Sequence, residues 1–227
     1  MDILSLDQQI TLACNGSNSL FWDNLMMTVT NTFSWSLLII TLIYIIFHNN
    51  KLRDALIVIL TIGTMIFVAD RLCSGLVKPW ISRLRPAQNP EIMYIVDTVN
   101  NYRGGSFSFF SGHACNTACV ATFLAWLFRS KRMTTALIFW SATTTYTRIY
   151  LGVHYIGDIA VGWLIGIVLG TFFYYLQYKL KTQSESPRLI SQQFTPTGYL
   201  RSDINSFLTI IFFNYIMVII VSLVKSF

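Results

Sequence analysis

Eight positions in this chain have the residue types and spacing needed to hold and transfer a phosphate group. They fall in three short segments, 78–86, 111–113 and 147–158. Two of the three histidines in the chain belong to the set. The set contains three cations, a Ser-Gly pair, two histidines and one carboxylate: Lys78, Arg85, Arg148, Ser111, Gly112, His113, His154 and Asp158.

The three cations suit a doubly charged anion, because a guanidinium forms paired hydrogen bonds with phosphate oxygens. Ser111 and Gly112 stand where a helix is predicted to begin. Unpaired backbone N–H groups and the positive end of the helix dipole favour an anion at such a position. Gly112 has no side chain, so the backbone can approach a phosphate closely. These residues predict a phosphate-binding site.

The two histidines and the carboxylate supply the reactive groups. His154 and Asp158 are four residues apart, so they can share one face of a helix. A carboxylate on one ring nitrogen fixes the tautomer and leaves the other nitrogen as a nucleophile. His113 titrates near neutral pH and could protonate a leaving oxygen. Phosphoryl transfer needs little beyond such positioning and charge stabilisation.

Composition indicates that membrane-spanning helices position these groups. Apolar residues make up 54% of the 227 residues and charged residues only 11%, against about 25% in soluble domains. Runs of about 20 apolar residues recur, each long enough to cross a bilayer as a helix. We therefore predict an all-α, polytopic transmembrane bundle of about six spans, which excludes a soluble enzyme, a disordered chain and a disulfide scaffold. The predicted spans cover 29–47, 55–77, 113–128, 134–146, 155–178 and 205–224.

The chain divides into four predicted parts. An interfacial amphipathic segment over 1–28 precedes a membrane core over 29–178. A cytoplasmic linker over 179–203 and an additional C-terminal transmembrane helix over 204–227 follow. The polar loop 78–110 is too long to be a mere connector. Three small residues, Gly162, Gly166 and Gly170, line one helix face and predict close helix packing.

The distribution of Lys and Arg predicts the orientation. Nine of them lie in the segments 48–54, 129–133 and 179–203, and six lie on the other side of the predicted bundle. Cytoplasmic loops carry the excess of basic residues, so the three segments are placed inside and the site outside. The net charge of +6 then reflects membrane topology and predicts the bilayer, not nucleic acid, as the partner. Arg83 and Arg103 are interpreted as interfacial anchors or as contacts of the lipid headgroup, and His48 as a solvated loop residue.

In these segments the chain resembles the type 2 phosphatidic acid phosphatase family, whose relatives include the vanadium haloperoxidases. The family pattern is K-x6-R-P, then P-S-G-H, then S-R-x5-H-x3-D. Here it reads Lys78-x6-Arg85-Pro86, then Phe110-Ser111-Gly112-His113, then Thr147-Arg148-x5-His154-x3-Asp158. The resemblance covers about residues 70–175. Phe110 replaces the family's Pro, Thr147 replaces its Ser, and two predicted spans precede the first motif where the family often has three.

The resemblance implies an acid phosphatase/vanadium-haloperoxidase-like core and a role for each residue. His154 would attack phosphorus to form a phosphohistidine, Asp158 would orient it, and His113 would act as general acid and then base. The phosphate would be held by Lys78, Arg85, Ser111, Gly112 and Arg148. The resemblance also implies no metal, no cofactor and a place in the bacterial inner membrane with the site facing the periplasm.

The expected activity is therefore hydrolysis of a lipid phosphate or diphosphate. Small bacterial members of the family act on undecaprenyl diphosphate, lipid A or phosphatidylglycerol phosphate. We expect one of the first two as substrate. A phosphatidylglycerol phosphate or phosphatidic acid phosphatase and a lipid-to-lipid phosphotransferase are the alternatives. The sequence does not indicate the oligomeric state.

Three rival functions use some of the same residues. An intramembrane serine protease would pair Ser111 with His154, although the G-x-S-x-G elbow is missing. A metal hydrolase would use His113, His154 and Asp158 as two-His-one-carboxylate ligands. A non-catalytic lipid-phosphate carrier would need the cations but not the His154–Asp158 pair.

Overall fold

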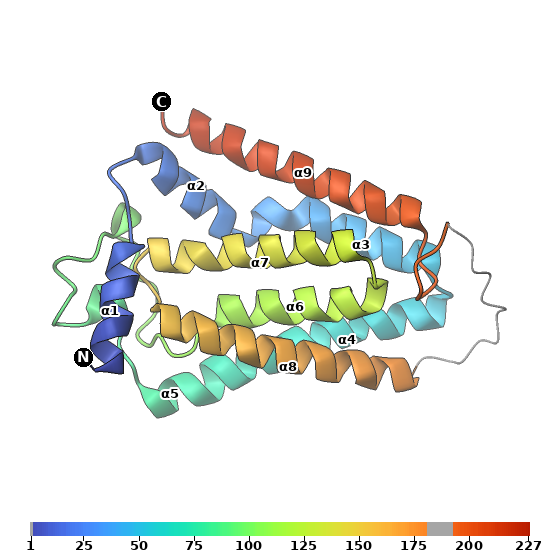
Figure 1. Ribbon diagram of the computed structural model, residues 1–227, viewed down its shortest axis with the longest axis horizontal. Coiled ribbons are helices and arrows are strands. Elements are labelled where there is room, and N and C mark those ends of the chain that lie inside the picture. The colour runs from blue at the N-terminus through green and yellow to red at the C-terminus, as the bar shows by residue number, and fades with distance from the viewer. Residues whose placement is uncertain (1, 181–192) are drawn as a thin grey trace.

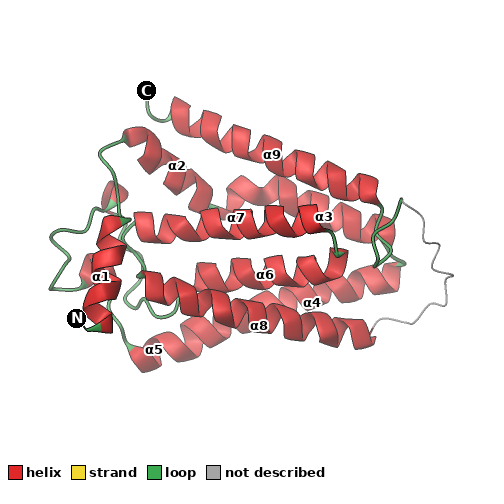
Figure 2. Cartoon of the chain, in the orientation of Figure 1, coloured by secondary structure: helices red, strands yellow, loops and turns green. Residues whose placement is uncertain are grey.

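The computed structural model describes residues 2–180 and 193–227, so residues 181–192 of the predicted linker lie outside the described residues. The described chain is almost entirely helical, as Figures 1 and 2 show. Isolated bridges join Leu84 to Phe107 and Phe194 to Leu200. The helices named in Figure 1 are α1 (Ile3–Ala13), α2 (Leu20–Thr30), α3 (Ser36–Asn49), α4 (Leu52–Asp70), α5 (Lys78–Ile81), α6 (Gly112–Phe128), α7 (Lys131–Tyr150), α8 (Ile156–Leu180) and α9 (Arg201–Val224).

Four helical stretches in the described part of the chain are long and apolar enough to cross a membrane: Thr32–Asn49, Leu52–Ile81, Ile156–Leu180 and Arg201–Val224. The all-α polytopic prediction is confirmed, but the count of about six spans is not. The two remaining predicted spans fall on α6 and α7. Most of α6 is buried in the bundle, and α7 carries many threonines as well as Arg148.

Helices α6 and α8 pack closely because three glycines line their contact, as the sequence predicted. A Cβ atom on Gly166 would lie 2.5 Å from the carbonyl oxygen of Cys115. The same short distance separates a Cβ on Gly170 from the Cys119 carbonyl oxygen. Small residues let two helix backbones approach in this way. The contact fixes the start of α6 beside the start of α8.

The helix that begins with α4 continues through a π-helical stretch, Arg71–Val77, into α5. It ends at Ser82, whose φ of 52° is left-handed. The loop that follows folds back over the end of the bundle, where the backbone N–H of Ser108 donates to the Arg83 carbonyl oxygen at 2.8 Å. π-Helical insertions are frequent near functional sites. Here the insertion directly precedes Lys78.

Helices α1 and α2 are the first two helices of the described chain. Helix α1 lies across the end of the bundle where α7 ends and α8 begins (Figure 1). The Ile156 N–H donates to the Thr11 hydroxyl at 3.1 Å, which joins α1 to α8. Helix α2 packs against α9 and α7. That residues 1–28 lie on the membrane surface stays a prediction.

Helix α9 corresponds to the predicted C-terminal helix and packs along α2, α3 and α7. The Tyr215 hydroxyl is 2.5 Å from the Thr143 hydroxyl of α7. The ring of Tyr215 lies edge-on to Trp35, with centroids 5.2 Å apart. This helix therefore closes the side of the bundle formed by the first helices and α7.

Candidate active site

The structure brings the three sequence segments together at one end of the bundle. Helix α5, the start of α6, the end of α7 and the start of α8 all reach that end (Figure 1). The backbone N–H of Ser111 donates to the carbonyl oxygen of Asp158 at 3.0 Å, which ties the start of α6 to α8. Lys78 is the first residue of α5, and Arg148 lies in the last turn of α7, so both belong to elements that reach this end.

His154 and Asp158 form the predicted pair. His154 Nδ1 lies 3.3 Å from Asp158 Oδ2, and the exposed fractions of the two residues are 2% and 0%. Helix α8 begins at Ile156, so the pair bridges the loop and the first turn of the helix. A carboxylate only accepts hydrogen bonds, so the Nδ1 atom carries the proton and Nε2 keeps a lone pair.

Burial lowers the pKa of His154 well below its usual range, and nearby positive charge lowers that pKa further. The charges come from Arg85, Arg148 and Lys78, with a smaller contribution from His113. Burial and like charge both disfavour the imidazolium form. His154 is therefore neutral at neutral pH, as a nucleophile must be.

Arg85 faces the other side of the imidazole. Its Nη1 atom donates to the carbonyl oxygen of Val153 at 2.9 Å and lies 3.3 Å from His154 Nε2. Gly104 covers the guanidinium with a φ of +67°, and a Cβ there would lie 2.9 Å from Nη1. Only glycine fits this approach without strain. Arg85 therefore sits where a phosphate bonded to Nε2 would place its oxygens.

Arg148 approaches the same point from α7 and is only 4% exposed. It donates to the Thr30 hydroxyl at 2.8 Å and to the Tyr102 hydroxyl at 3.2 Å. Among the described residues, neither Arg148 Nε nor Arg85 Nε has a hydrogen-bond partner. Buried donors are nearly always satisfied, so these two orphaned N–H groups indicate an anion-binding site.

The start of α6 supplies the backbone part of the site. Ser111 is the N-cap, and its side-chain oxygen accepts from the Ala114 N–H at 3.4 Å. The first amide N–H groups of a helix lack partners within it and favour an anion. A Cβ added to Gly112 would lie 3.4 Å from the Cys73 sulfur. His113 follows as the second residue of α6.

The structure corrects two interpretations from the sequence, that of Arg83 and part of that of His48. Arg83 is not an interfacial anchor, because it forms ion pairs with Asp158 at 2.9 Å and with Asp7 at 2.7 Å. His48 is exposed, as expected, but it lies in α3 and not in a loop, and its Nδ1 atom lies 2.8 Å from Asp203 Oδ2. Each contact joins residues at least 75 positions apart. Local spacing therefore carried no signal for either of them.

Sequence reasoning did not assign Tyr102 to the phosphate site. The sequence indicated only that the loop 78–110, which contains this tyrosine, is too long to be a mere connector. The Tyr102 hydroxyl accepts from Arg148, and the Arg148 guanidinium lies 5.6 Å from the ring centroid. Its position among aromatic and glycine residues of the 87–109 loop was the one available signal.

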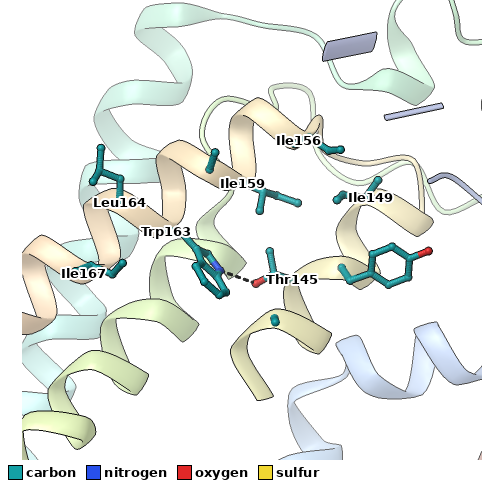
Figure 3. Close-up of a pocket in the computed structure, with 10 residues that line it drawn as sticks. Thr145, Ile149, Ile156, Ile159, Trp163, Leu164 and Ile167 are labelled. Carbon is teal, nitrogen blue, oxygen red and sulfur yellow. Dashed lines mark hydrogen bonds between the residues drawn. The ribbon is translucent and has the colours of Figure 1, made fainter. Parts of the chain in front are cut away.

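An apolar groove of about 490 Å³ lies between α7 and α8, but it is not the phosphate site. Figure 3 shows it lined by isoleucines and by Trp163, whose indole N–H donates to the Thr145 hydroxyl at 3.2 Å. None of the eight predicted site residues lines it. Asp158 instead contacts Ser111 at the start of α6 and Arg83 of the loop that follows α5.

The contacts bear on two rival functions. The Ser111 hydroxyl caps α6 and, within the described ranges, has no hydrogen bond to either site histidine, so the protease arrangement is not formed. Both oxygens of Asp158 already accept from Arg83, Tyr155 N–H and His154. Across the described residues, no three His, Cys, Asp or Glu side chains form a group that could hold a metal ion.

Comparison with known proteins identifies the family of this chain. The family model of the PAP2 superfamily matches residues 54–182. A lipid A 4'-phosphatase from Bacteroides thetaiotaomicron is 39% identical over 80% of this chain and 82% of its own length. A lipid A 4'-phosphatase from Porphyromonas gingivalis is 32% identical over 76% of this chain and 73% of its own length.

A solved structure has the same fold. A transmembrane PAP2 type phosphatidylglycerolphosphate phosphatase from Bacillus subtilis is similar with a TM-score of 0.60 and 25% identity. The similarity covers 80% of this chain and 89% of that one. The chain belongs to the PAP2 superfamily. It is a multi-pass membrane phosphatase that hydrolyses phosphoric esters.

Proposed function

We propose that this membrane lipid phosphatase removes a phosphate group from lipid A through a phosphohistidine at His154. Two relatives that align with three quarters or more of the chain carry the name lipid A 4'-phosphatase. We therefore place lipid A ahead of undecaprenyl diphosphate, the other substrate expected from the sequence.

One observation carries the mechanism. The neutral His154 imidazole is held between Asp158 at Nδ1 and Arg85 at Nε2. The carboxylate orients the ring, and the guanidinium marks where the anion would lie. A phosphate oxygen that accepts from Arg85 would free the Nε2 lone pair for attack on phosphorus.

In the first step, His154 Nε2 forms a bond to phosphorus as the bond to the lipid oxygen breaks. His113 gives its proton to the leaving lipid oxygen. The Nδ1–H bond to Asp158 stabilises the positive charge that develops on the ring. The phosphoryl oxygens are held by Lys78, Arg85, Arg148 and the start of α6.

In the second step, the neutral His113 takes a proton from water, and the water oxygen attacks phosphorus. The bond from phosphorus to His154 Nε2 breaks, which releases inorganic phosphate and restores the enzyme. A second lipid hydroxyl in place of water would make the enzyme a phosphotransferase. The same residues would serve both reactions.

We place the site at the periplasmic face of a bacterial inner membrane. The site lies at one end of the bundle, and the connection from α6 to α7 lies at the other (Figure 1). Arg129 is in the short loop of this connection, and Lys131 and Arg132 begin α7. Basic loops favour the cytoplasmic side. This orientation supports access to lipid headgroups of the outer leaflet.

Phosphatidylglycerol phosphate is the second candidate substrate. It is supported by the similarity to the Bacillus subtilis phosphatase structure, which covers four fifths of the chain. Both candidates carry a phosphate monoester, which the site would bind in the same way. The difference lies in the lipid part, and a substrate panel separates them.

The test measures phosphate release by purified protein in detergent with EDTA present. The panel contains lipid A, phosphatidylglycerol phosphate, undecaprenyl diphosphate and phosphatidic acid. We expect the fastest release from lipid A and a loss of at least about 10³-fold in His154→Ala. His48→Ala at the opposite end is the matched control and should retain the wild-type rate.

Faster release from another lipid would replace lipid A as the substrate and leave the mechanism standing. Undiminished release by His154→Ala would overturn the phosphohistidine. Loss of activity in EDTA would support the alternative that the protein is a metal hydrolase. No release from any lipid would support the carrier alternative instead.

A further inference from the structure

A chain of three charged side chains connects the first helix of the protein to the candidate catalytic carboxylate. Arg83 Nη2 lies 2.7 Å from Asp7 Oδ2 in α1, and Arg83 Nη1 lies 2.9 Å from Asp158 Oδ1 in α8. The guanidinium also lies over Tyr155, 3.8 Å from the ring centroid. Two ion pairs and a ring contact leave Arg83 little freedom.

The two oxygens of Asp158 have separate tasks. Oδ1 accepts from Arg83, whereas Oδ2 accepts from the Tyr155 N–H at 3.1 Å and faces His154 Nδ1 at 3.3 Å. Asp158 is completely buried. Arg83 therefore selects the oxygen that meets the imidazole and provides the positive charge that a buried carboxylate requires.

Helix α1 holds this arrangement from outside. Asp7 Oδ1 accepts from the Gly157 N–H at 2.8 Å, and the Thr11 hydroxyl accepts from the Ile156 N–H at 3.1 Å. These two N–H groups belong to the first two residues of α8. Asp7 and Thr11 of α1 therefore cap α8, in place of a residue that directly precedes the helix. Asp7 thus contacts both Arg83 and the helix that carries Asp158.

We infer that Arg83, held by Asp7 of α1, is a positioning residue that sets the orientation and charge of Asp158 for His154. The inference rests on the proposed function of His154 as nucleophile. It makes helix α1 part of the catalytic apparatus, although α1 lies more than 140 residues before His154 in the sequence.

The pH dependence distinguishes positioning from simple support of the fold. His154 is faced by Lys78 of α5, Arg85 of the loop, His113 of α6, Arg148 of α7 and Asp158 of α8. Asp158 is the one negative group among them, and Arg83 partly cancels its charge. Removal of the Arg83 charge should raise the pKa of His154, because an unscreened carboxylate favours the imidazolium. Protonated His154 cannot attack, so the acid limb of activity should move to higher pH.

The experiment compares the pH profile of kcat/KM for the wild type, Arg83→Gln, Arg83→Lys and Asp7→Asn. For Arg83→Gln we expect kcat to fall about 10-fold or more with KM changed less than about twofold, and the acid limb to rise by about 0.5 pH unit or more. Arg83→Lys should restore the acid limb but only part of kcat, because lysine keeps the charge and loses the paired geometry. Asp7→Asn should show the smaller change in kcat.

Arg71→Gln and Asp2→Asn are the matched controls, because both original side chains are exposed and lie outside the chain of charges. Both controls should retain the wild-type rate and profile. If Arg83→Gln does not fold, Asp7→Asn tests the inference alone, since it keeps Arg83 and weakens its support.

The outcomes separate this inference from the proposed function. A wild type that releases no phosphate from any lipid overturns the proposed function and the inference with it. An active wild type with an unchanged acid limb and kcat in Arg83→Gln overturns the positioning role alone. A fall in kcat with an unmoved acid limb in all three variants also overturns it, because support of the fold explains that result.

Discussion

The two ends of the helical bundle use the same residue types in opposite ways. At the site end, Arg85 and Arg148 are 7% and 4% exposed and lie close to His154. At the other end, Arg129, Lys131 and Arg201 are exposed around a pocket of about 400 Å³. Buried arginine is costly and needs a partner, whereas exposed arginine needs none. We propose that burial separates the cations that bind phosphate from the cations that orient the chain in the membrane.

The largest expected difference between the two ends concerns arginine geometry. Arg148→Lys keeps the positive charge but removes the forked donors that reach Thr30, Tyr102 and the phosphate site. We expect the rate of phosphate release to fall by about 10²-fold. Arg132→Lys at the opposite end should change that rate by less than about twofold. Initial rates on the preferred lipid, measured side by side, check both values.

Equal rates in the two variants would break the comparison, since burial would then not mark the functional cations. A large loss in Arg132→Lys would show that the basic end also takes part in turnover. Retained thermal stability in Arg148→Lys is the necessary control. Without it, a lost rate would report unfolding.

A second comparison concerns glycines inside two helices. A Cβ on Gly166 of α8 would lie 2.5 Å from a backbone oxygen of α6, whereas a Cβ on Gly63 of α4 meets no described atom within 4 Å. We expect Gly166→Ala to destabilise the protein by about 1–3 kcal/mol, because the α6–α8 contact must open. Gly63→Ala should be neutral or stabilising by up to about 1 kcal/mol. Thermal unfolding in detergent measures the difference.

The α6–α8 contact also positions the start of α6 against Asp158, so Gly166→Ala should lose activity along with stability. A Gly166→Ala protein with wild-type stability would show that α6 and α8 can separate freely. Close glycine packing would then no longer explain how the start of α6 is held beside Asp158.

The sequence was sufficient to predict the helical class and the residues that meet at the candidate site. Short motifs such as Ser111-Gly112-His113 combine a cap, a bare backbone and a titratable group, and each property is local. The glycine face of α8 was also predictable, because its glycines recur every four residues within one helix. A single sequence therefore reveals functional groups that lie close together along the chain.

The contacts that were missed all join distant segments. Asp7, Arg83 and Asp158 come from three parts of the chain, and neither Asp7 nor Arg83 differs by local sequence from an ordinary surface charge. The span count was difficult for a related reason. Helix α6 is buried among other helices, so its composition reflects protein packing as much as lipid contact. The long-range contacts and the number of spans both depend on which side chains are buried in the folded protein.

The smallest expected effect tests how far the site extends into the loop that covers it. Tyr102→Phe removes the hydroxyl that accepts from Arg148 and keeps the ring beside the guanidinium. Loss of one hydrogen bond to a charged group should lower kcat/KM by about 3- to 10-fold. Tyr94→Phe in the same loop, where Tyr94 is 85% exposed, should leave kcat/KM unchanged. A tenfold loss in both variants would assign the effect to the loop as a whole, whereas no loss in Tyr102→Phe would confine the site to the residues of the three motifs.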